Sequence, residues 1–262
     1  TLKKRYNNLI SQAKKTNAND AFQLIMTSYT DAIDPHTTYY NPSFAQAFNE
    51  GMSNTFEGIG ARLQMENEMV TINEVIAGGP AFKDKTLKID DRIIGVAQGK
   101  GEFEDIVGWR IDAAVAKIKG SKGTEVRLKI LPAGQDISAQ PTIVSLTREK
   151  IVIEEESAQK KVKIVKGEDG KDYKIGIITL PKFYIDFAAA RNGDPNYKST
   201  TRDVRLILDS LKAENVDGVL LDLRNNGGGS LQEAIELTGL FIDKGPVVQV
   251  RQVNNKVDIE RD

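Results

Sequence analysis

Three consecutive glycines, Gly227 to Gly229, follow an apolar run and precede a segment that begins at Ser230. Glycine lets the backbone take positive φ and lets another group approach closely. Amides in such a loop, near the start of a helix, favour negative charge. The loop could therefore receive a phosphate, a carboxylate or the oxyanion of an acyl-transfer reaction, or it could be a packing turn. Neither a Walker motif nor a dinucleotide fingerprint fits, because no Gly-Lys-Ser/Thr follows and the glycines are not spaced.

The elements around this loop are predicted from periodicity and capping residues. The apolar residues 219–223 predict a buried strand before the glycines. Ser230 and Glu233 predict a capping box, in which each side chain accepts the other residue's backbone amide. Thr200 and Asp203 predict a second helix that starts in the same way. Strands and helices thus alternate here, as in an α/β layer.

The composition excludes several kinds of site. The 262 residues carry a formal net charge of −1, include no cysteine and include one histidine. Zinc-thiolate centres, disulfides, a cysteine nucleophile and a multi-histidine metal site are therefore excluded, and we predict no metal and no cofactor. No basic field indicates nucleic acid, and no apolar run is long enough to span a membrane. His36 lies in a Pro- and Thr-rich turn, where we interpret it as structural.

A second group of glycines lies at residues 58–61, Gly-Ile-Gly-Ala, ahead of several short predicted strands. Residues 109–119 predict an amphipathic helix after them, with Ile111, Ala114, Val115 and Ile118 on one face. Residues 1 to about 50 are predicted to be helical. In that part, Asn19 or Asp20 caps a helix that ends at Asp34-Pro35, because the residue before proline avoids helical geometry.

Residues 56–148 resemble a PDZ domain in the permuted form found in bacterial proteases. Gly58 to Ala61 matches the family's carboxylate-binding loop, and residues 78–81 and 91–96 match later landmarks. Asp90 stands where the family usually has glycine, but Asp tolerates left-handed geometry, so we expect the turn to survive. Glu57, rather than a cation, precedes the loop.

This resemblance implies that the domain binds the free C-terminus of a peptide. The carboxylate would be held by the loop Gly58, Ile59, Gly60 and Ala61, mainly by the last three amides, and the peptide would add as a strand beside it. An apolar last side chain would lie in a pocket that includes Leu63, Ile111 and Val115.

Three motifs in order are similar to the carboxyl-terminal processing, or tail-specific, serine proteases, nearest to the periplasmic ones of Gram-negative bacteria. They are the helical start with Asp-Pro-His-Thr at 34–37, the PDZ-like segment, and Leu-Asp-Leu-Arg-Asn-Asn-Gly-Gly-Gly at 221–229. The implied fold is mixed α and β. It comprises an N-terminal helical segment (1–55), a PDZ domain (56–148) and part of an α/β serine protease domain (149–262).

Members of that family are endopeptidases with a Ser-Lys dyad that bind apolar C-termini and cleave the tethered chain. The family's oxyanion-hole glycine corresponds to Gly228, with Gly229 beside it, while Gly227 replaces a proline that many relatives have. The family's nucleophile and lysine base would lie beyond Asp262, so we expect this segment to be inactive by itself. We interpret Ser230 as a helix cap rather than a nucleophile.

The resemblance also implies a periplasmic location, protein or peptide substrates with apolar tails, and room for an adaptor protein. Two other functions stay open. One is a non-catalytic PDZ scaffold that binds peptides. The other is a small-molecule enzyme that uses the glycine loop for a phosphate.

Overall fold

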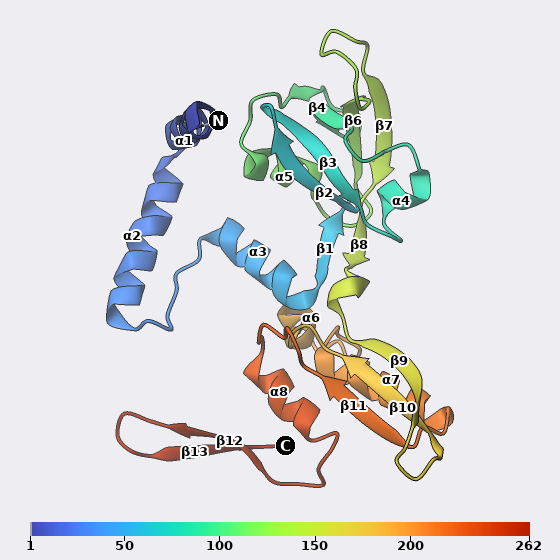
Figure 1. Ribbon diagram of the computed structural model, residues 1–262. Helices are drawn as coiled ribbons and strands as arrows, with labels where there is room; N and C mark the ends of the chain where they lie inside the picture. Colours follow the sequence, from blue (N-terminus) through green and yellow to red (C-terminus); the bar gives the residue numbers. More distant parts are fainter. Residues whose placement is uncertain (1) are drawn as a thin grey trace. The chain divides into compact units, whose positions relative to one another are not determined.

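The computed structural model describes residues 2–262 and has mixed α and β structure, as the sequence predicted. The chain forms two compact units (Figure 1). The N-terminal unit comprises the residues up to Phe48 together with Glu57–Ile151, and the C-terminal unit comprises Asn49–Phe56 together with Val152–Asp262. One boundary falls within helix α3 (Pro42–Ser53), and the other two fall within the short paired strands β1 (Thr55–Gly58) and β8 (Glu149–Val152). The expected domain limits at 55/56 and 148/149 stay predictions.

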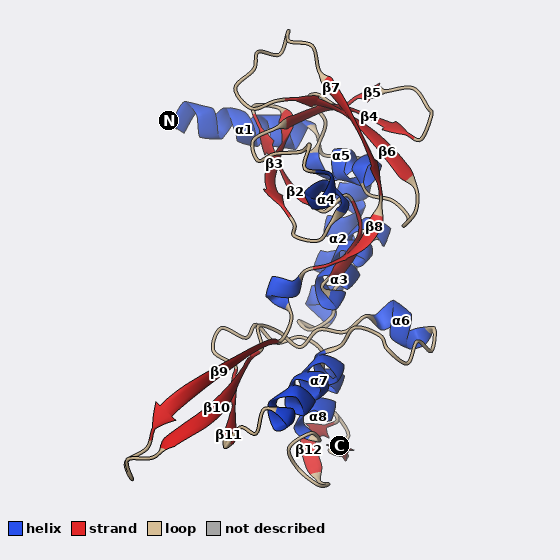
Figure 2. Cartoon of the chain, turned by 90° about the vertical axis from the view of Figure 1, so that its right-hand side faces the viewer, coloured by secondary structure: helices blue, strands red, loops and turns tan. Residues whose placement is uncertain are grey.

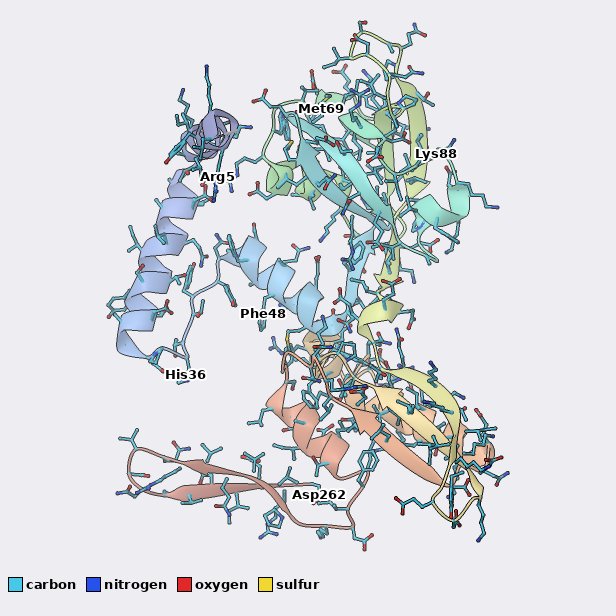
Figure 3. The ribbon with its side chains drawn as sticks, viewed as in Figure 1. Arg5, His36, Phe48, Met69, Lys88 and Asp262 are labelled. Atoms are coloured by element: carbon cyan, nitrogen blue, oxygen red, sulfur yellow. The ribbon has the colours of Figure 1, made fainter. Side chains whose placement is uncertain are left out.

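Three helices begin the chain: α1 (Leu2–Lys14), α2 (Ala18–Ile33) and α3 (Pro42–Ser53). The predicted cap of α2 was wrong, because Asn17 is the N-cap and Asp20 is its partner three residues on in a capping box. Helix α2 ends at Ile33, directly before the extended Asp34, as Pro35 requires. Figure 3 shows His36 in the turn that follows α2, and its ring lies 3.3 Å from the Asp34 carboxylate.

An antiparallel sheet forms the body of the N-terminal unit, in the order β2-β3-β4-β6-β7, with β5 beside β4. Its strands are β2 (Ala61–Glu66), β3 (Met69–Val75), β4 (Arg92–Gln98), β5 (Glu104–Asp105), β6 (Glu125–Leu131) and β7 (Thr142–Thr147). The short helices α4 (Pro80–Asp84) and α5 (Ile111–Ile118) complete it. Asp90 takes the expected left-handed conformation, with φ of 68°.

The sheet and α5 enclose one apolar core, to which Ile72, Ile93, Leu128 and Ile118 contribute fully buried side chains. Arg148 is 2% exposed beside it, and its guanidinium donates to the carbonyls of Lys117 and Ile118 at the end of α5. Burial lowers the pKa of Arg148. These bonds satisfy helix-end carbonyls that would otherwise lack partners.

The C-terminal unit has a three-stranded sheet in the order β11-β10-β9, in which β10 runs antiparallel to β9 and parallel to β11 (Figure 2). Ile178, Leu180, Tyr184, Val204 and Leu211 form its buried core. The elements are η1 (Glu154–Glu156), β9 (Gln159–Lys166), β10 (Asp172–Thr179), α6 (Phe187–Arg191), α7 (Thr200–Ala213), β11 (Gly218–Asp222), α8 (Leu231–Thr238), β12 (Pro246–Arg251) and β13 (Val257–Arg261).

Two predictions for this unit were wrong. Strand β11 forms where expected, but it lies at the edge of the sheet, so Val219 and Leu220 are 41% and 51% exposed rather than buried. Helix α7 is capped by Ser199, whose hydroxyl accepts the Arg202 amide, and not by Thr200. Asp203 has other partners, which are the Tyr184 hydroxyl and the Lys198 ammonium, both at 2.6 Å.

No helix among residues 2–262 is both long enough and apolar enough to cross a membrane.

Candidate functional site

The glycine loop of the N-terminal unit leads directly into the edge strand β2. Gly60 has φ of +78°, and an added Cβ there would lie 2.9 Å from the Gly79 Cα, so only glycine fits without a shift. The Ile59 and Gly60 carbonyls accept the amides of Ala81 and Ile76, each at 2.9 Å. Among residues 2–262, the amides of Ile59 and Gly60 themselves have no hydrogen-bond partner. The loop thus offers two donors at the start of β2.

The residues around these donors have the expected character. Gly58 ends β1 and Ala61 begins β2, so the four predicted loop residues follow one another through the turn. The Glu57 carboxylate accepts the Lys122 amide at 2.9 Å, which directs its charge to another loop. Neither the loop residues 58–61 nor Glu57 supplies a cation, so an anion here would be bound by backbone amides.

The three predicted pocket residues lie on the two elements that flank the loop, β2 and α5. Leu63 and Ile111 are partly buried and pack against the core that contains the 3%-exposed Ile59. Val115 lies one helical turn after Ile111 and is also half-buried. Helix α5 packs beside β2, so the structure brings an apolar surface next to the free amides of the loop.

The triple-glycine loop of the C-terminal unit lies against the segment that follows β10. The Phe183 amide donates to the Gly228 carbonyl at 2.8 Å, and the Ser230 amide donates to the Phe183 carbonyl at 2.9 Å. Gly228 and Gly229 have φ of +92° and +138°. A Cβ on Gly229 would overlap the backbone of Phe183, whereas one on Gly227 or Gly228 would meet nothing within 4 Å.

Asn226 organises this loop, although the sequence motif had not suggested a role for it. Its Nδ2 donates to the Leu180 carbonyl at 2.9 Å, and its Oδ1 accepts the Gly228 amide at 2.8 Å. An asparagine two residues before a glycine is a known signal for such a side-chain turn. The Gly228 amide is therefore bonded within the loop, while the Gly229 amide has no partner among residues 2–262.

The charges beside the loop are paired with one another. Both Oδ atoms of Asp222 accept from the Arg224 guanidinium, at 2.9 and 2.7 Å. These bonds lower the pKa of Asp222 to about 2. Arg224 is highly exposed, so the pair is a local surface interaction of small energetic weight. No group of three or more Asp, Glu or His side chains in residues 2–262 is arranged to hold a metal ion.

Ser230 is the N-cap of α8, as predicted, since its hydroxyl accepts the Glu233 amide. The reciprocal half of the predicted box was wrong. Glu233 is fully buried, and its Oε2 instead accepts the Thr201 amide of α7 at 2.8 Å. Its Oε1 has no partner among the described residues. Burial raises the pKa of Glu233, and the bonds from Thr201 oppose that shift. One carboxyl group thus joins the starts of two helices.

The buried carboxyl predicts a pH-dependent stability. A raised folded-state pKa means that the stability contribution of Glu233 is full below its unfolded-state pKa and is lost as pH rises through its folded-state pKa. The neutral variant Glu233→Gln should therefore gain stability relative to wild type as pH rises from 4 to 8 in denaturant titrations. Glu236→Gln, on the same helix but only half-buried, is the control. Parallel curves for Glu233→Gln and wild type would contradict the shift.

Comparisons with known proteins match all three parts of the chain. A tail-specific protease N-terminal domain matches residues 1–43, a PDZ domain matches residues 51–131, and peptidase family S41 matches residues 174–262. The tail-specific protease of Haemophilus influenzae is 40% identical over 261 residues, which is 100% of this chain and 34% of that protein. The carboxy-terminal processing protease CtpA of Bacillus subtilis is 32% identical over 227 residues, or 86% and 42% of the two chains.

The chain therefore spans about a third of the length of the first relative and about two fifths of the second. Among solved structures, the PDZ domain of a carboxy-terminal protease from Vibrio cholerae, in complex with peptide, is 47% identical and covers 37% of this chain and 97% of its own, with a TM-score of 0.36. The photosystem II D1 C-terminal processing protease is 20% identical over 94% of this chain and 60% of its own, with a TM-score of 0.38. The three domain matches and the two sequence relatives agree, and the chain is similar over its whole length to the carboxy-terminal processing, or tail-specific, proteases.

Proposed function

We propose that this chain is the substrate-recognising part of a Ser-Lys dyad endopeptidase, which binds apolar protein C-termini through its PDZ domain and cleaves the tethered chain in the periplasm. The observation that carries the recognition step is the pair of unpartnered amides of Ile59 and Gly60, at the start of an edge strand and beside an apolar helix face. Similarity to a tail-specific protease and the match to peptidase family S41 support the proteolytic step.

In this proposal a tail adds as a strand along β2, with its carboxylate at the amides of Ile59, Gly60 and Ala61. Charge-assisted bonds from amides to a carboxylate are stronger than neutral ones and so select a free C-terminus. The last side chain enters the pocket of Leu63, Ile111 and Val115. Tethering raises the concentration of the bound chain near the protease domain.

For the cleavage step we infer that a lysine with a lowered pKa takes the proton of a serine, which attacks the peptide carbonyl. Gly228 and Gly229 would supply an amide to the oxyanion; loss of one such donor costs on the order of 3 kcal/mol. Ser230 serves as a cap, and the chain spans only about a third of its first relative, so we assign the serine and the lysine to chain outside residues 1–262. Residues 1–262 alone are then expected to show no turnover of an unstructured protein with an apolar tail.

The carboxylate provides the test of recognition. A fluorescent heptapeptide that ends in valine should bind residues 1–262 at least tenfold more tightly, by anisotropy, than the same peptide with an amidated end. A peptide that ends in aspartate is the control for the apolar pocket. Equal binding of acid and amide would contradict the proposal. If the full-length protein prefers the peptide with a free carboxylate but does not hydrolyse a tethered chain, it is a peptide-binding scaffold instead.

A further inference from the structure

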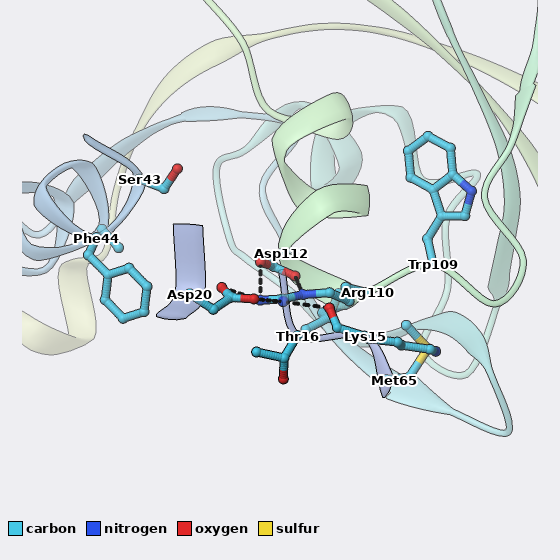
Figure 4. Close-up of a pocket in the computed structure, with 11 residues that line it drawn as sticks. Lys15, Thr16, Asp20, Ser43, Phe44, Met65, Trp109, Arg110 and Asp112 are labelled. Carbon is cyan, nitrogen blue, oxygen red and sulfur yellow. Dashed lines mark hydrogen bonds and ion pairs between the residues drawn. The ribbon is translucent and has the colours of Figure 1, made fainter. Parts of the chain in front are cut away.

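A hollow of about 590 Å³ lies in the N-terminal unit between the N-terminal helices and the start of α5 (Figure 4). Its apolar lining comes from α3, from the far end of β2 and from the start of α5. Its polar lining comes from the α1–α2 junction, from the first turns of α2 and α3, and from the start of α5. The apolar members are Phe44, Ala47, Met65, Trp109 and Ile111, and the polar members are Lys15, Thr16, Asp20, Ser43, Arg110 and Asp112. Ile111 belongs to both this hollow and the expected tail pocket, so the two sites share one residue at the start of α5.

The polar end of the hollow is internally neutralised. Arg110 contacts the carboxylates of Asp20 and Asp112, and it also donates to the Lys15 carbonyl at 3.0 Å. The Lys15 ammonium donates to the Gly108 carbonyl at 2.9 Å. The arginine lowers the pKa of both carboxyls. No uncompensated charge is left to attract an ion, so these groups act as a tether between the helices and α5.

A second set of bonds holds the connection from α2 into α3, the helix that carries part of the apolar wall. The Gln23 side chain of α2 donates to the Tyr39 carbonyl at 2.5 Å and accepts the Asn41 amide at 2.7 Å, which fixes the connection into α3. Phe44 then extends from α3 and is 51% exposed, and Met65 of β2 is 36% exposed. An exposed phenylalanine and methionine at one hollow are an apolar surface with room for another side chain.

The position of the hollow along β2 determines which side chain of a bound tail would reach it. A tail whose carboxylate lies at the loop before Ala61 must run antiparallel to β2, toward Met65. Met65 is four residues beyond Ala61, or about 14 Å along a strand. Alternate side chains of an extended peptide face the same way, so the residue four positions before the last faces the same side as the last residue.

We propose that this hollow is a second specificity site, which takes an apolar side chain four residues before the C-terminus of a bound tail. This rests on the proposed tail-binding function and extends it from the last residue to the upstream sequence. Helices α1–α3 then have a role in recognition, because α3 supplies one wall of the hollow and Arg110 bonds the α1–α2 junction to the start of α5.

The test uses residues 1–262 and the labelled peptide Gly-Ser-Xaa-Ser-Ala-Ala-Val with a free carboxylate, where Xaa is leucine or serine. By anisotropy, leucine should bind about tenfold more tightly than serine, because burial of its side chain contributes about 1.4 kcal/mol, which is that ratio. Phe44→Ala should remove most of this preference. Phe48→Ala is the matched control, since Phe48 lies one turn later on α3, is 45% exposed and does not line the hollow.

Two further peptides keep the result decisive if Phe44→Ala disturbs folding. Leucine moved one residue toward the C-terminus faces the other way and should give no gain on the wild-type protein. The short peptide Ser-Ala-Ala-Val, which cannot reach the hollow, should bind all three proteins equally. If the short peptide binds but leucine gives no preference, or the preference survives Phe44→Ala, the second site is refuted and tail binding stands. If the short peptide does not bind at all, tail binding falls and this inference falls with it.

Discussion

Replacing Gly229 with alanine should destabilise the C-terminal unit by about 3 kcal/mol, the largest stability effect we expect from a single methyl group in this chain. A Cβ at this position would overlap the carbonyl oxygen of Phe183 and lie 2.8 and 2.9 Å from its carbon and nitrogen. Phe183 cannot yield easily, because its amide and carbonyl are both bonded to the glycine loop. The φ of +138° adds backbone strain for any residue other than glycine.

Gly227→Ala is the matched control for this substitution. A Cβ there meets nothing within 4 Å, so its unfolding free energy should stay within about 0.5 kcal/mol of wild type. Urea denaturation followed by far-UV circular dichroism measures both variants. Within the proposed enzyme at full length, Gly229→Ala should also lower kcat by roughly a hundredfold, because a displaced loop loses an oxyanion donor. Equal stabilities for the two variants would show that the loop is loosely held.

Replacing Gly60 with alanine should weaken binding of a carboxylate-ended peptide by about a hundredfold, since two charge-assisted bonds depend on the geometry of this turn. The alanine Cβ would lie 2.9 Å from the Gly79 Cα and would also strain the left-handed φ of +78°. Relief of that contact has to separate the loop from residues 76–81, where the amides of Ala81 and Ile76 donate to the Ile59 and Gly60 carbonyls. The two free amides would then diverge.

Gly123→Ala separates the effect of backbone strain at positive φ from the effect of the Cβ contact with Gly79. Gly123 has φ of +85°, close to that of Gly60, but open space around its Cβ position. It should carry the same backbone strain of about 1 kcal/mol and leave peptide affinity unchanged. Anisotropy titrations with the valine-ended peptide, beside thermal melts, give both quantities. A similar loss of affinity in the two variants would mean that global destabilisation, rather than loop geometry, governs binding.

Local signals in the sequence predicted those parts of the fold that depend on a few neighbouring residues. The end of α2 before Pro35, the amphipathic face of α5 and the left-handed Asp90 are confirmed, because each follows from allowed backbone geometry or a 3.6-residue period. The mixed α and β class was predicted for the same reason, together with the family resemblance.

The predicted caps of α2 and α7 were displaced by one to three residues. Two other errors concern side chains whose partners lie outside their own helix. Glu233 was expected to cap its own helix, but it bonds Thr201, which is 32 residues away and comes close only after α7 and α8 pack. Asp203 was expected to complete a box and instead bonds Tyr184 and Lys198. Residues 219–223 read as fully buried because their apolar character does not reveal whether a strand is central or at an edge.

Asn226 gives the triple-glycine loop a resident ligand. Its neutral side-chain oxygen accepts the hydrogen bond of the Gly228 amide, with 2.8 Å between oxygen and nitrogen. The proposed oxyanion would have to take over this same hydrogen bond. A neutral substrate carbonyl gains little by displacing one neutral acceptor with another, whereas a charged oxygen forms a bond about twice as strong. Displacement therefore becomes favourable only as negative charge develops. A loop whose amide already has an acceptor would favour the transition state, because only a charged oxygen replaces the Asn226 oxygen at the Gly228 amide with a gain in energy.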